Sequence, residues 1–263
     1  MLIKLIKEGP EINGFCSGCW NSAMVQELIK IKFGVLYSVK YVANLLHNLG
    51  FSYQKAKFES CHLNPEDREK WLQQTFPKAF SLAKRRNALL LFGDECSFPM
   101  WGSLSYTWGE RGVQPLIKTS GKRTACKVFG AIDYFTGKFF SKIIKEKFNS
   151  ESYIGFVKEI FISTKKHIIL IQDGARYHTS AEVSAFFKNN KDRITIFQMP
   201  SYSPDYNPIE ILWKKVKKEG VHLRYFPTIE TLVDSVQCML SFFKCAKDEV
   251  LKVFGFYTKL GYA

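Results

Sequence analysis

The first fifty residues contain two short stretches in which apolar side chains recur at helical spacing. The first begins after Asn21, a good N-cap residue, and ends at Gly34. Its apolar stripe consists of Met24, Val25, Leu28 and Ile29. The second begins after Ser38 and ends at Gly50. Its stripe consists of Val39, Val42, Leu45, Leu46 and Leu49. Two short helices joined by a glycine-containing turn predict a helix-turn-helix.

The polar face of the second helix carries side chains that can bind DNA. They are Lys40, Tyr41, Asn44 and His47. Because such groups bond base edges or phosphates, we expect this helix to read DNA. Residues 51–58 alternate partly and contain two lysines, which favours a β wing on the DNA backbone. The alternative is a small helical domain whose polar face is only solvated.

Residues 61–86 have the pattern of a helical connector. Asn64 and Pro65 are typical of a helix start, and Pro77 is expected to interrupt that helix. The chain is therefore divided into a winged helix-turn-helix domain at 1–60, the connector at 61–86 and an α/β domain at 87–263.

From residue 88 onward the periodicity is that of a sheet. A continuous apolar run over 88–92 predicts a strand that is buried on both faces and ends at Asp94. Residues 124–133 and 138–145 are rich in β-forming residues and flank a turn, which predicts an antiparallel hairpin.

A helix is expected over 150–163, and the following apolar run from His167 ends in Asp173. A further strand is expected over 193–198. If the strands that end in Asp94 and Asp173 are parallel neighbours, the two carboxylates meet at one edge of the sheet, where ligand sites form.

A third acid, Glu210, lies in the first turn of a helix that Asn207 caps and Pro208 begins. Its predicted packing stripe consists of Ile209, Leu212, Trp213 and Val216. Lys214, Lys217 and Lys218 make the rest of this helix basic and suited to a phosphate backbone. A last amphipathic stripe, from Leu232 to Phe243, predicts a helix that covers the sheet.

Composition supports a folded chain with a polyanionic partner. The sequence has 38 Lys and Arg against 24 Asp and Glu, a net charge of +14, and 46% hydrophobic residues. No apolar run approaches the roughly 20 residues of a membrane helix, and no signal peptide is recognisable, so we expect a cytoplasmic, nucleoid-associated protein without a membrane partner. Seven scattered cysteines favour reduced thiols. Cys16 and Cys19 form a CxxC pair that lacks standard zinc-finger spacing, so we favour free thiols over zinc.

Three carboxylates that converge require a cation. Their hard oxygens favour Mg²⁺, with Mn²⁺ as a substitute, over zinc. Taken singly, a strand-end aspartate often caps a turn and a first-turn glutamate often complements the helix dipole. Asp94, Asp173 and Glu210 together are harder to explain in that way.

The stretches Asp94-Glu95, Asp173-Gly-Ala-Arg-Tyr-His178 and Tyr202-Ser-Pro-Asp-Tyr-Asn-Pro-Ile-Glu210 resemble those of DDE transposases of the mariner-type superfamily, in particular the bacterial insertion-sequence branch. The resemblance implies a ribonuclease-H-like fold with a mixed five-stranded sheet. It also implies Asp94, Asp173 and Glu210 as catalytic, metal-binding residues, with two metal ions per site. Glu95 and His178 are possible supporting residues beside that site.

The expected function is metal-dependent cutting at element ends and joining of 3′ ends to target DNA by two-metal phosphoryl transfer. The expected partner is double-stranded DNA, bound by a homodimer. Gly174 departs from the family, which usually has Asn there. The chain also has no room before Trp20 for the additional helix-turn-helix of a complete transposase, which indicates a truncated copy or the product of a split reading frame. The alternatives are a catalytically silent DNA-binding regulator and a stand-alone nuclease of the same fold.

Overall fold

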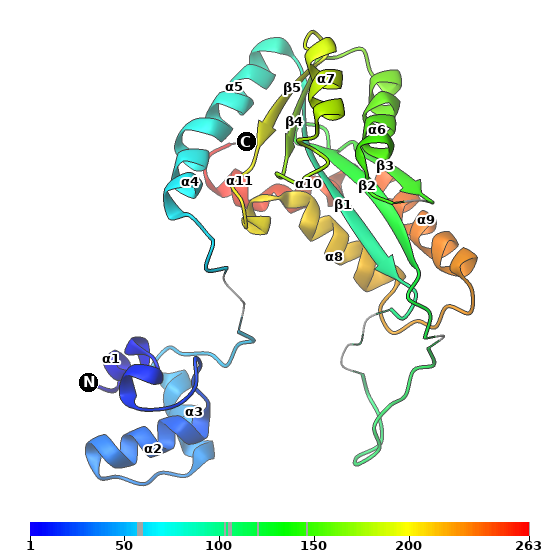
Figure 1. Ribbon diagram of the computed structural model, residues 1–263. Coiled ribbons are helices and arrows are strands. Elements are labelled where there is room, and N and C mark those ends of the chain that lie inside the picture. Colours follow the sequence, from blue (N-terminus) through cyan, green and yellow to red (C-terminus); the bar gives the residue numbers. More distant parts are fainter. Residues whose placement is uncertain (57–59, 103, 105–106, 120, 146, 263) are drawn as a thin grey trace. The chain divides into compact units, whose positions relative to one another are not determined.

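The computed structural model describes residues 1–56, 60–102, 104, 107–119, 121–145 and 147–262. The chain divides into two compact units, Met1–Ser60 and Cys61–Ala263 (Figure 1). Each unit has hydrophobic core residues of its own.

The first unit is helical. It consists of α1 (Leu2–Glu8), α2 (Ser22–Phe33) and α3 (Val39–Asn48). The predicted caps are confirmed, since the side chains of Asn21 and Ser38 accept hydrogen bonds from backbone N–H groups of α2 and α3, and Gly34 is left-handed with φ 72°. Its small core consists of Ile6, Val25, Ile29 and Val42. The sequence analysis did not predict α1, which brings Ile6 into that core.

The predicted β wing is not seen in the part of it that the structure describes. Residues 51–56 form no strand, and 57–59 lie outside the described residues. An isolated two-stranded ribbon is marginal on its own, and the described remainder of this unit provides no sheet that would stabilise one.

The second unit is built on a mixed five-stranded sheet in the order β3-β2-β1-β4-β5. The strands are β1 (Leu89–Pro99), β2 (Ala125–Asp133), β3 (Phe139–Ile144), β4 (Ile168–Gln172) and β5 (Ile194–Gln198). The predicted hairpin is confirmed by the antiparallel pairing of β2 and β3, and β1, β4 and β5 are parallel. The expectation of two parallel neighbours that bring Asp94 and Asp173 together is therefore confirmed.

The prediction that the first strand ends at Asp94 is wrong. β1 continues to Pro99, because its antiparallel pairing with β2 extends from Leu91 to Pro99, whereas its parallel pairing with β4 stops at Phe92. Asp94 thus lies inside β1, at the level where β4 ends. The apolar run marked the end of the two-sided burial and not the end of the strand.

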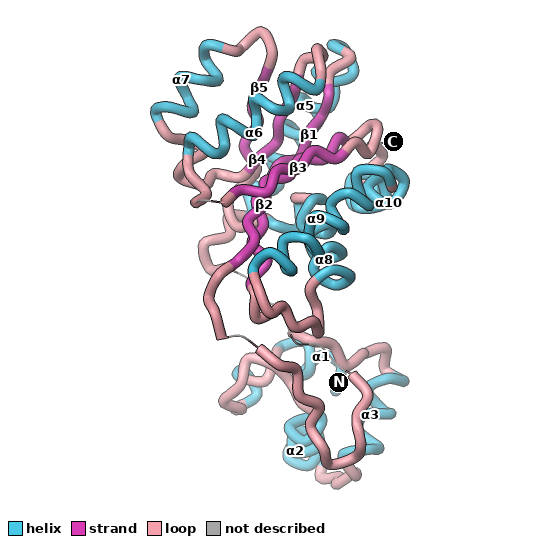
Figure 2. Tube along the Cα trace, turned by 90° about the vertical axis from the view of Figure 1, so that its right-hand side faces the viewer, coloured by secondary structure: helices cyan, strands magenta, loops and turns pink. Residues whose placement is uncertain are grey.

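Helices cover both faces of the sheet (Figures 1 and 2). One face is covered by α6 (Ser150–Ser163) and α7 (Ala181–Asn189). The other carries α5 (Phe76–Arg86), α8 (Pro208–Gly220), α9 (Ile229–Cys245), α10 (Lys247–Leu251) and α11 (Gly255–Lys259). Alternate residues of β1 enter the two cores, with Leu90 and Phe92 on the side of α5 and α8 and Leu89 and Leu91 on the side of α6.

Pro77 does not interrupt the helix that Asn64 caps. The path runs from α4 (Pro65–Lys70) through a π-helical turn at Trp71–Thr75 into α5. The wider turn accommodates a proline, which lacks the N–H that an α-helix would use there. Trp71 and Phe76 are fully buried in the sheet's core, so this segment, expected as a connector, packs as part of the second unit.

Within the described residues, no helix is long and apolar enough to cross a bilayer.

Candidate active site

The three predicted acids lie around one cavity, at the end of the sheet where the parallel strand β4 finishes. Asp94 comes from β1, Asp173 directly follows β4, and Glu210 is in the first turn of α8. All three line a pocket of about 390 Å³, together with residues of the loop between β5 and α8. The structure therefore brings together what the sequence spacing predicted, from three elements that are far apart along the chain.

Asp94 is in an environment that disfavours its charge. Burial, followed by the neighbouring charges of Glu210 and Glu95, raises its pKa to about 8. Its Oδ2 atom is buried and has no hydrogen-bond partner among the described residues. A buried carboxylate oxygen without a donor, beside two further acids, is suited to a cation.

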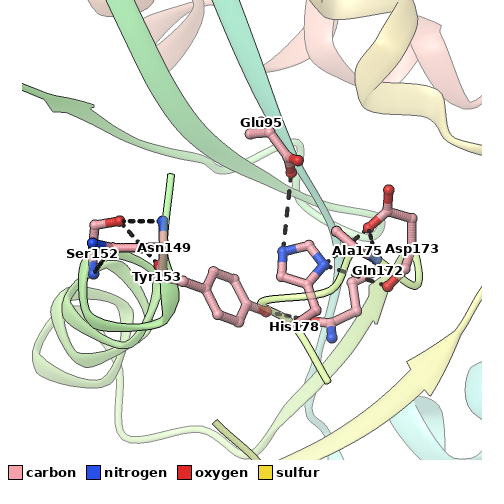
Figure 3. Close-up of polar contacts among 8 residues, drawn as sticks. All are labelled: Glu95, Asn149, Ser152, Tyr153, Gln172, Asp173, Ala175 and His178. Atoms are coloured by element: carbon pink, nitrogen blue, oxygen red, sulfur yellow. Dashed lines mark hydrogen bonds and ion pairs between the residues drawn. The ribbon is translucent and has the colours of Figure 1, made fainter. Parts of the chain in front are cut away.

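Asp173 is held in place by two donors (Figure 3). Its Oδ1 atom accepts a hydrogen bond from the backbone N–H of Ala175 at 3.1 Å and lies 2.9 Å from Nδ1 of His178. The hydrogen bond from His178 is the main reason that the pKa of Asp173 is lowered, against the effect of burial. With Oδ1 occupied, the other oxygen remains for a ligand.

His178 links Asp173 to Glu95. Its side chain is 2% exposed, and its Nε2 atom lies 4.0 Å from Oε2 of Glu95, beyond hydrogen-bond distance. The ring packs against Tyr153, with centroids 4.4 Å apart. Burial raises the pKa of Glu95. Glu95, Asp173 and His178 are close enough for one atom of each to ligate a single ion. The two supporting residues expected from the sequence thus lie next to Asp173.

The position of Glu210 depends on how α8 packs against the sheet. The predicted stripe is buried at Ile209, Leu212, Trp213 and Val216. Gly130 of β2 is the register partner of Asp94, and a Cβ at Gly130 would lie 2.5 Å from the Trp213 ring. Glycine thus lets α8 approach the sheet beside the first acid.

Asn207 is a residue of the site whose role the sequence analysis missed. It was expected to cap α8, but its side chain makes no capping hydrogen bond. It is 4% exposed, lines the same pocket as the acids, and its Oδ1 atom is buried without a hydrogen-bond partner among the described residues. The sequence contained one signal for this role. Asn207 lies three positions before Glu210, and at helical spacing this places both side chains on the same face.

The basic and polar residues predicted to bind DNA are largely accessible. Those on α3, namely Lys40, Tyr41, Asn44 and His47, are all exposed. On α8, Lys214 and Lys218 are exposed, whereas Lys217 is half-buried, with Nζ 5.8 Å from the centroid of the Phe98 ring. Part of the Lys217 side chain is therefore used for packing.

Two further sequence features have defined surroundings. Gly174, where the resembled family usually has Asn, lies close to Gln198, because a Cβ there would collide with the Nε2 atom of that side chain. Cys16 and Cys19 are exposed free thiols.

The fold and the site define an α/β domain with three acids gathered at one pocket, preceded by a helix-turn-helix. A family profile described as DDE superfamily endonuclease matches residues 89–233, more than half of the chain. A profile described as winged helix-turn-helix matches residues 17–75. The chain belongs to the DDE superfamily of endonucleases.

Individual relatives agree. The Tc3 transposase of Caenorhabditis elegans is 30% identical over 177 residues, which cover 62% of this chain and 51% of that protein. The chain therefore spans about half the length of this curated relative. A pre-cleavage Mos1 transpososome has a TM-score of 0.64 at 14% identity, covering 97% of this chain and 75% of that one. The Mos1 paired-end complex with the left transposon end has a TM-score of 0.61 at 16% identity, covering 95% and 76%.

These solved structures bear on the fold. They confirm the expected ribonuclease-H-like α/β architecture. The profile match over residues 17–75 confirms that the preceding domain is of the winged helix-turn-helix class, although residues 51–56 form no strand. The resemblance to DDE transposases is confirmed at the level of the superfamily. The assignment to the bacterial insertion-sequence branch stays a prediction.

Proposed function

We propose that this chain carries the catalytic activity of a transposase: metal-dependent cutting of DNA at element ends and joining of 3′ ends to target DNA. The observation that carries the proposal is the pocket in which Asp94, Asp173 and Glu210 meet, with a buried Asp94 oxygen that lacks a donor among the described residues. The family and the similarity to a transposase support the substrate class.

Divalent cations fit this pocket. Three carboxylates and the amide oxygen of Asn207 form an all-oxygen donor set, which suits Mg²⁺ or Mn²⁺. Mos1 paired-end complexes have been crystallised with Mn and with Mg, which supports the same choice here. We propose two ions, held by Asp94, Asp173 and Glu210. When bound, they would activate the attacking oxygen and stabilise the leaving oxygen of phosphoryl transfer.

The remaining residues of the site act on these carboxylates. His178 and the Ala175 amide fix the orientation of Asp173 through Oδ1. Glu95 lies on the other side of His178, with its Oε2 atom 4.0 Å from Nε2 of that ring. Asn207, at the N-terminus of α8, offers a side-chain oxygen that has no hydrogen-bond partner among the described residues.

We propose that double-stranded DNA contacts α3 through Lys40, Tyr41, Asn44 and His47, and α8 through Lys214, Lys217 and Lys218. The net charge of +14 supports a polyanionic partner and association with the nucleoid. We further propose a homodimer on DNA. The similar Mos1 structures are described as paired-end complexes, in which two element ends are brought together. Two ends would be bound by two copies of the chain, which supports the proposed homodimer.

The test is cleavage of DNA carrying the native element ends in the presence of Mn²⁺. Asp94→Asn, Asp173→Asn and Glu210→Gln should each abolish cleavage and strand joining and leave DNA binding largely intact, because a neutral amide keeps the shape but loses the charge that holds an ion. Glu151→Gln, an exposed carboxylate on α6, is the matched control. Hydrolysis without joining would identify a nuclease, and binding without cleavage a regulator. Full activity of a triad variant would remove that residue from the site.

A further inference from the structure

The loop between β5 and α8, residues 199–207, lines the acidic pocket and is locally strained. Tyr202 has a left-handed backbone with φ 55°, a conformation that residues other than glycine rarely adopt. A short 3₁₀ turn, Pro204–Tyr206, then leads into Asn207. Such a loop keeps one conformation only if the surroundings hold it. The direction in which Asn207 and Glu210 enter the pocket depends on that conformation.

Arg68 of α4 supplies this support. Its guanidinium donates two parallel hydrogen bonds to Asp205, from Nη1 to Oδ1 at 3.0 Å and from Nη2 to Oδ2 at 2.7 Å. Nη1 also donates to the hydroxyl of Ser203 at 3.1 Å. The same group lies over the Tyr206 ring, 4.1 Å from its centroid. One side chain thus contacts three of the four residues at 203–206.

A second set of contacts fixes the same turn from the core. Trp71, one turn after Arg68, donates from Nε1 to the hydroxyl of Tyr257, and that hydroxyl donates to the carbonyl of Tyr206 at 2.8 Å. Both Trp71 and Tyr257 are fully buried. Because these residues belong to the core, the segment that carries Arg68 is a rigid support.

The chemistry of the pair favours positioning over a general contribution to stability. The Arg68 side chain is 19% exposed and that of Asp205 38% exposed, so water weakens their attraction. A bidentate guanidinium combined with stacking nevertheless fixes direction, which a lysine could not do.

We propose that Arg68 is a positioning residue of the active site, which holds residues 203–206 and thereby aims Asn207 and Glu210 at the metal-binding pocket. This inference rests on the proposed function. It assigns to α4, a helix that begins five residues after the DNA-binding unit ends, a direct part in shaping the catalytic pocket.

The experiment compares wild-type full-length chain with Arg68→Gln and Arg68→Lys by calorimetric titration of Mn²⁺ and by hydrogen exchange without metal. Arg68→Gln should weaken Mn²⁺ binding about 10-fold or more, as is usual when a residue that orients a metal ligand is lost. The amide of Tyr206, which donates to the Ser203 carbonyl at 3.0 Å, should exchange faster. Arg68→Lys keeps the charge but loses the bidentate hydrogen bonds to Asp205, so its Mn²⁺ affinity and exchange rate should lie between those of the wild type and Arg68→Gln.

Lys142→Gln is the matched control, since it removes a similarly exposed partner from an ion pair with Glu159 at 2.6 Å on another part of the domain. It should change neither measurement. Asp205→Asn should reproduce the defect, and the double variant Arg68→Gln/Asp205→Asn should be no worse than either single variant, because the two residues act as one unit. Thermal unfolding of each variant verifies that the domain is folded.

Unchanged Mn²⁺ affinity and unchanged exchange in Arg68→Gln, with normal Mn²⁺ binding by the wild type, would overturn the inference alone. Absence of Mn²⁺ binding in the wild type would overturn the proposed function, and this inference with it. Equal defects in Lys142→Gln would reduce the effect of Arg68 to a general loss of charge pairing and would also overturn it.

Discussion

At the scale of single residues, the pocket contains opposed electrostatic environments for two acids of one site. Asp94 is surrounded by apolar burial and by acids, and its pKa is raised to about 8. The pKa of Asp173, which accepts hydrogen bonds from His178 and Ala175, is lowered. The pocket therefore holds one carboxylate that is ready to ligate and one that must lose a proton when a cation binds.

The pH dependence of stability follows from the raised pKa of Asp94. The pKa of Asp94 is higher in the folded than in the unfolded state. Its contribution to the free energy of unfolding is therefore fully present below about pH 4 and is lost as the pH rises towards 8. Without metal, Asp94→Asn should gain free energy of unfolding relative to the wild type on going from pH 5.5 to 7.5, by at most about 2.7 kcal/mol. The lowered pKa of Asp173 acts in the acid range and leaves this window unaffected.

Urea unfolding in EDTA at both pH values measures the difference. Because the wild type is compared with the variant, titrating groups that do not interact with Asp94 cancel. Glu151→Gln should show no pH-dependent gain. A stability difference that is the same at pH 5.5 and 7.5 would show that Asp94 does not carry the proton.

At the scale of elements, the sequence pattern identified most helices and strands but not the contacts between them. The bounds of α6 and the caps of α2 and α3 were predicted correctly, because capping and periodicity are local. The continuation of β1 past Asp94 was missed, because it depends on pairing with β2, which is distant in sequence. For the same reason no local pattern revealed that Arg68 reaches Asp205, or that the Asn207 side chain leaves its cap position.

The contact between α8 and the sheet leads to a second prediction. A methyl group at Gly130 would lie within 2.6 Å of two atoms of the Trp213 ring, which is fully buried and cannot withdraw. Gly130→Ala should therefore lower the free energy of unfolding by about 1 to 3 kcal/mol. Because α8 carries Glu210, metal-dependent cleavage should fall as well.

Denaturant unfolding and cleavage assays on the same preparations measure both effects. Gly255→Ala is the control, because a Cβ at that glycine meets nothing within 4 Å and its φ is not positive. Combining Gly130→Ala with Trp213→Phe should restore part of the loss by making room. If Gly130→Ala were as stable and active as the wild type, the close approach of α8 would not determine the position of Glu210.

At the scale of the whole molecule, the proposed binding of DNA would be divided between the two units. The first unit presents a polar helix face at α3, and the second presents exposed lysines on α8, the helix that carries Glu210. Base edges carry sequence information, whereas phosphates do not. The expected division is therefore that α3 selects the element end and α8 holds the backbone near the acids.

This division predicts different outcomes for variants of the two units. Asn44→Ala removes an amide that can bond a base edge, and should cost about 1 to 3 kcal/mol of discrimination for the cognate end while leaving non-specific binding nearly unchanged. Replacing Lys214, Lys217 and Lys218 together should weaken binding to all sequences and flatten the salt dependence of affinity, because fewer counterions are released. The measurement is a titration of each variant with cognate and scrambled DNA at two salt concentrations.

Since Lys217 packs on Phe98, the pair Lys214 and Lys218 alone should account for most of the change in slope. An unchanged ratio of cognate to scrambled affinity in Asn44→Ala would rule out α3 as the reader, and an unchanged slope in the lysine variant would rule out α8 as a phosphate contact.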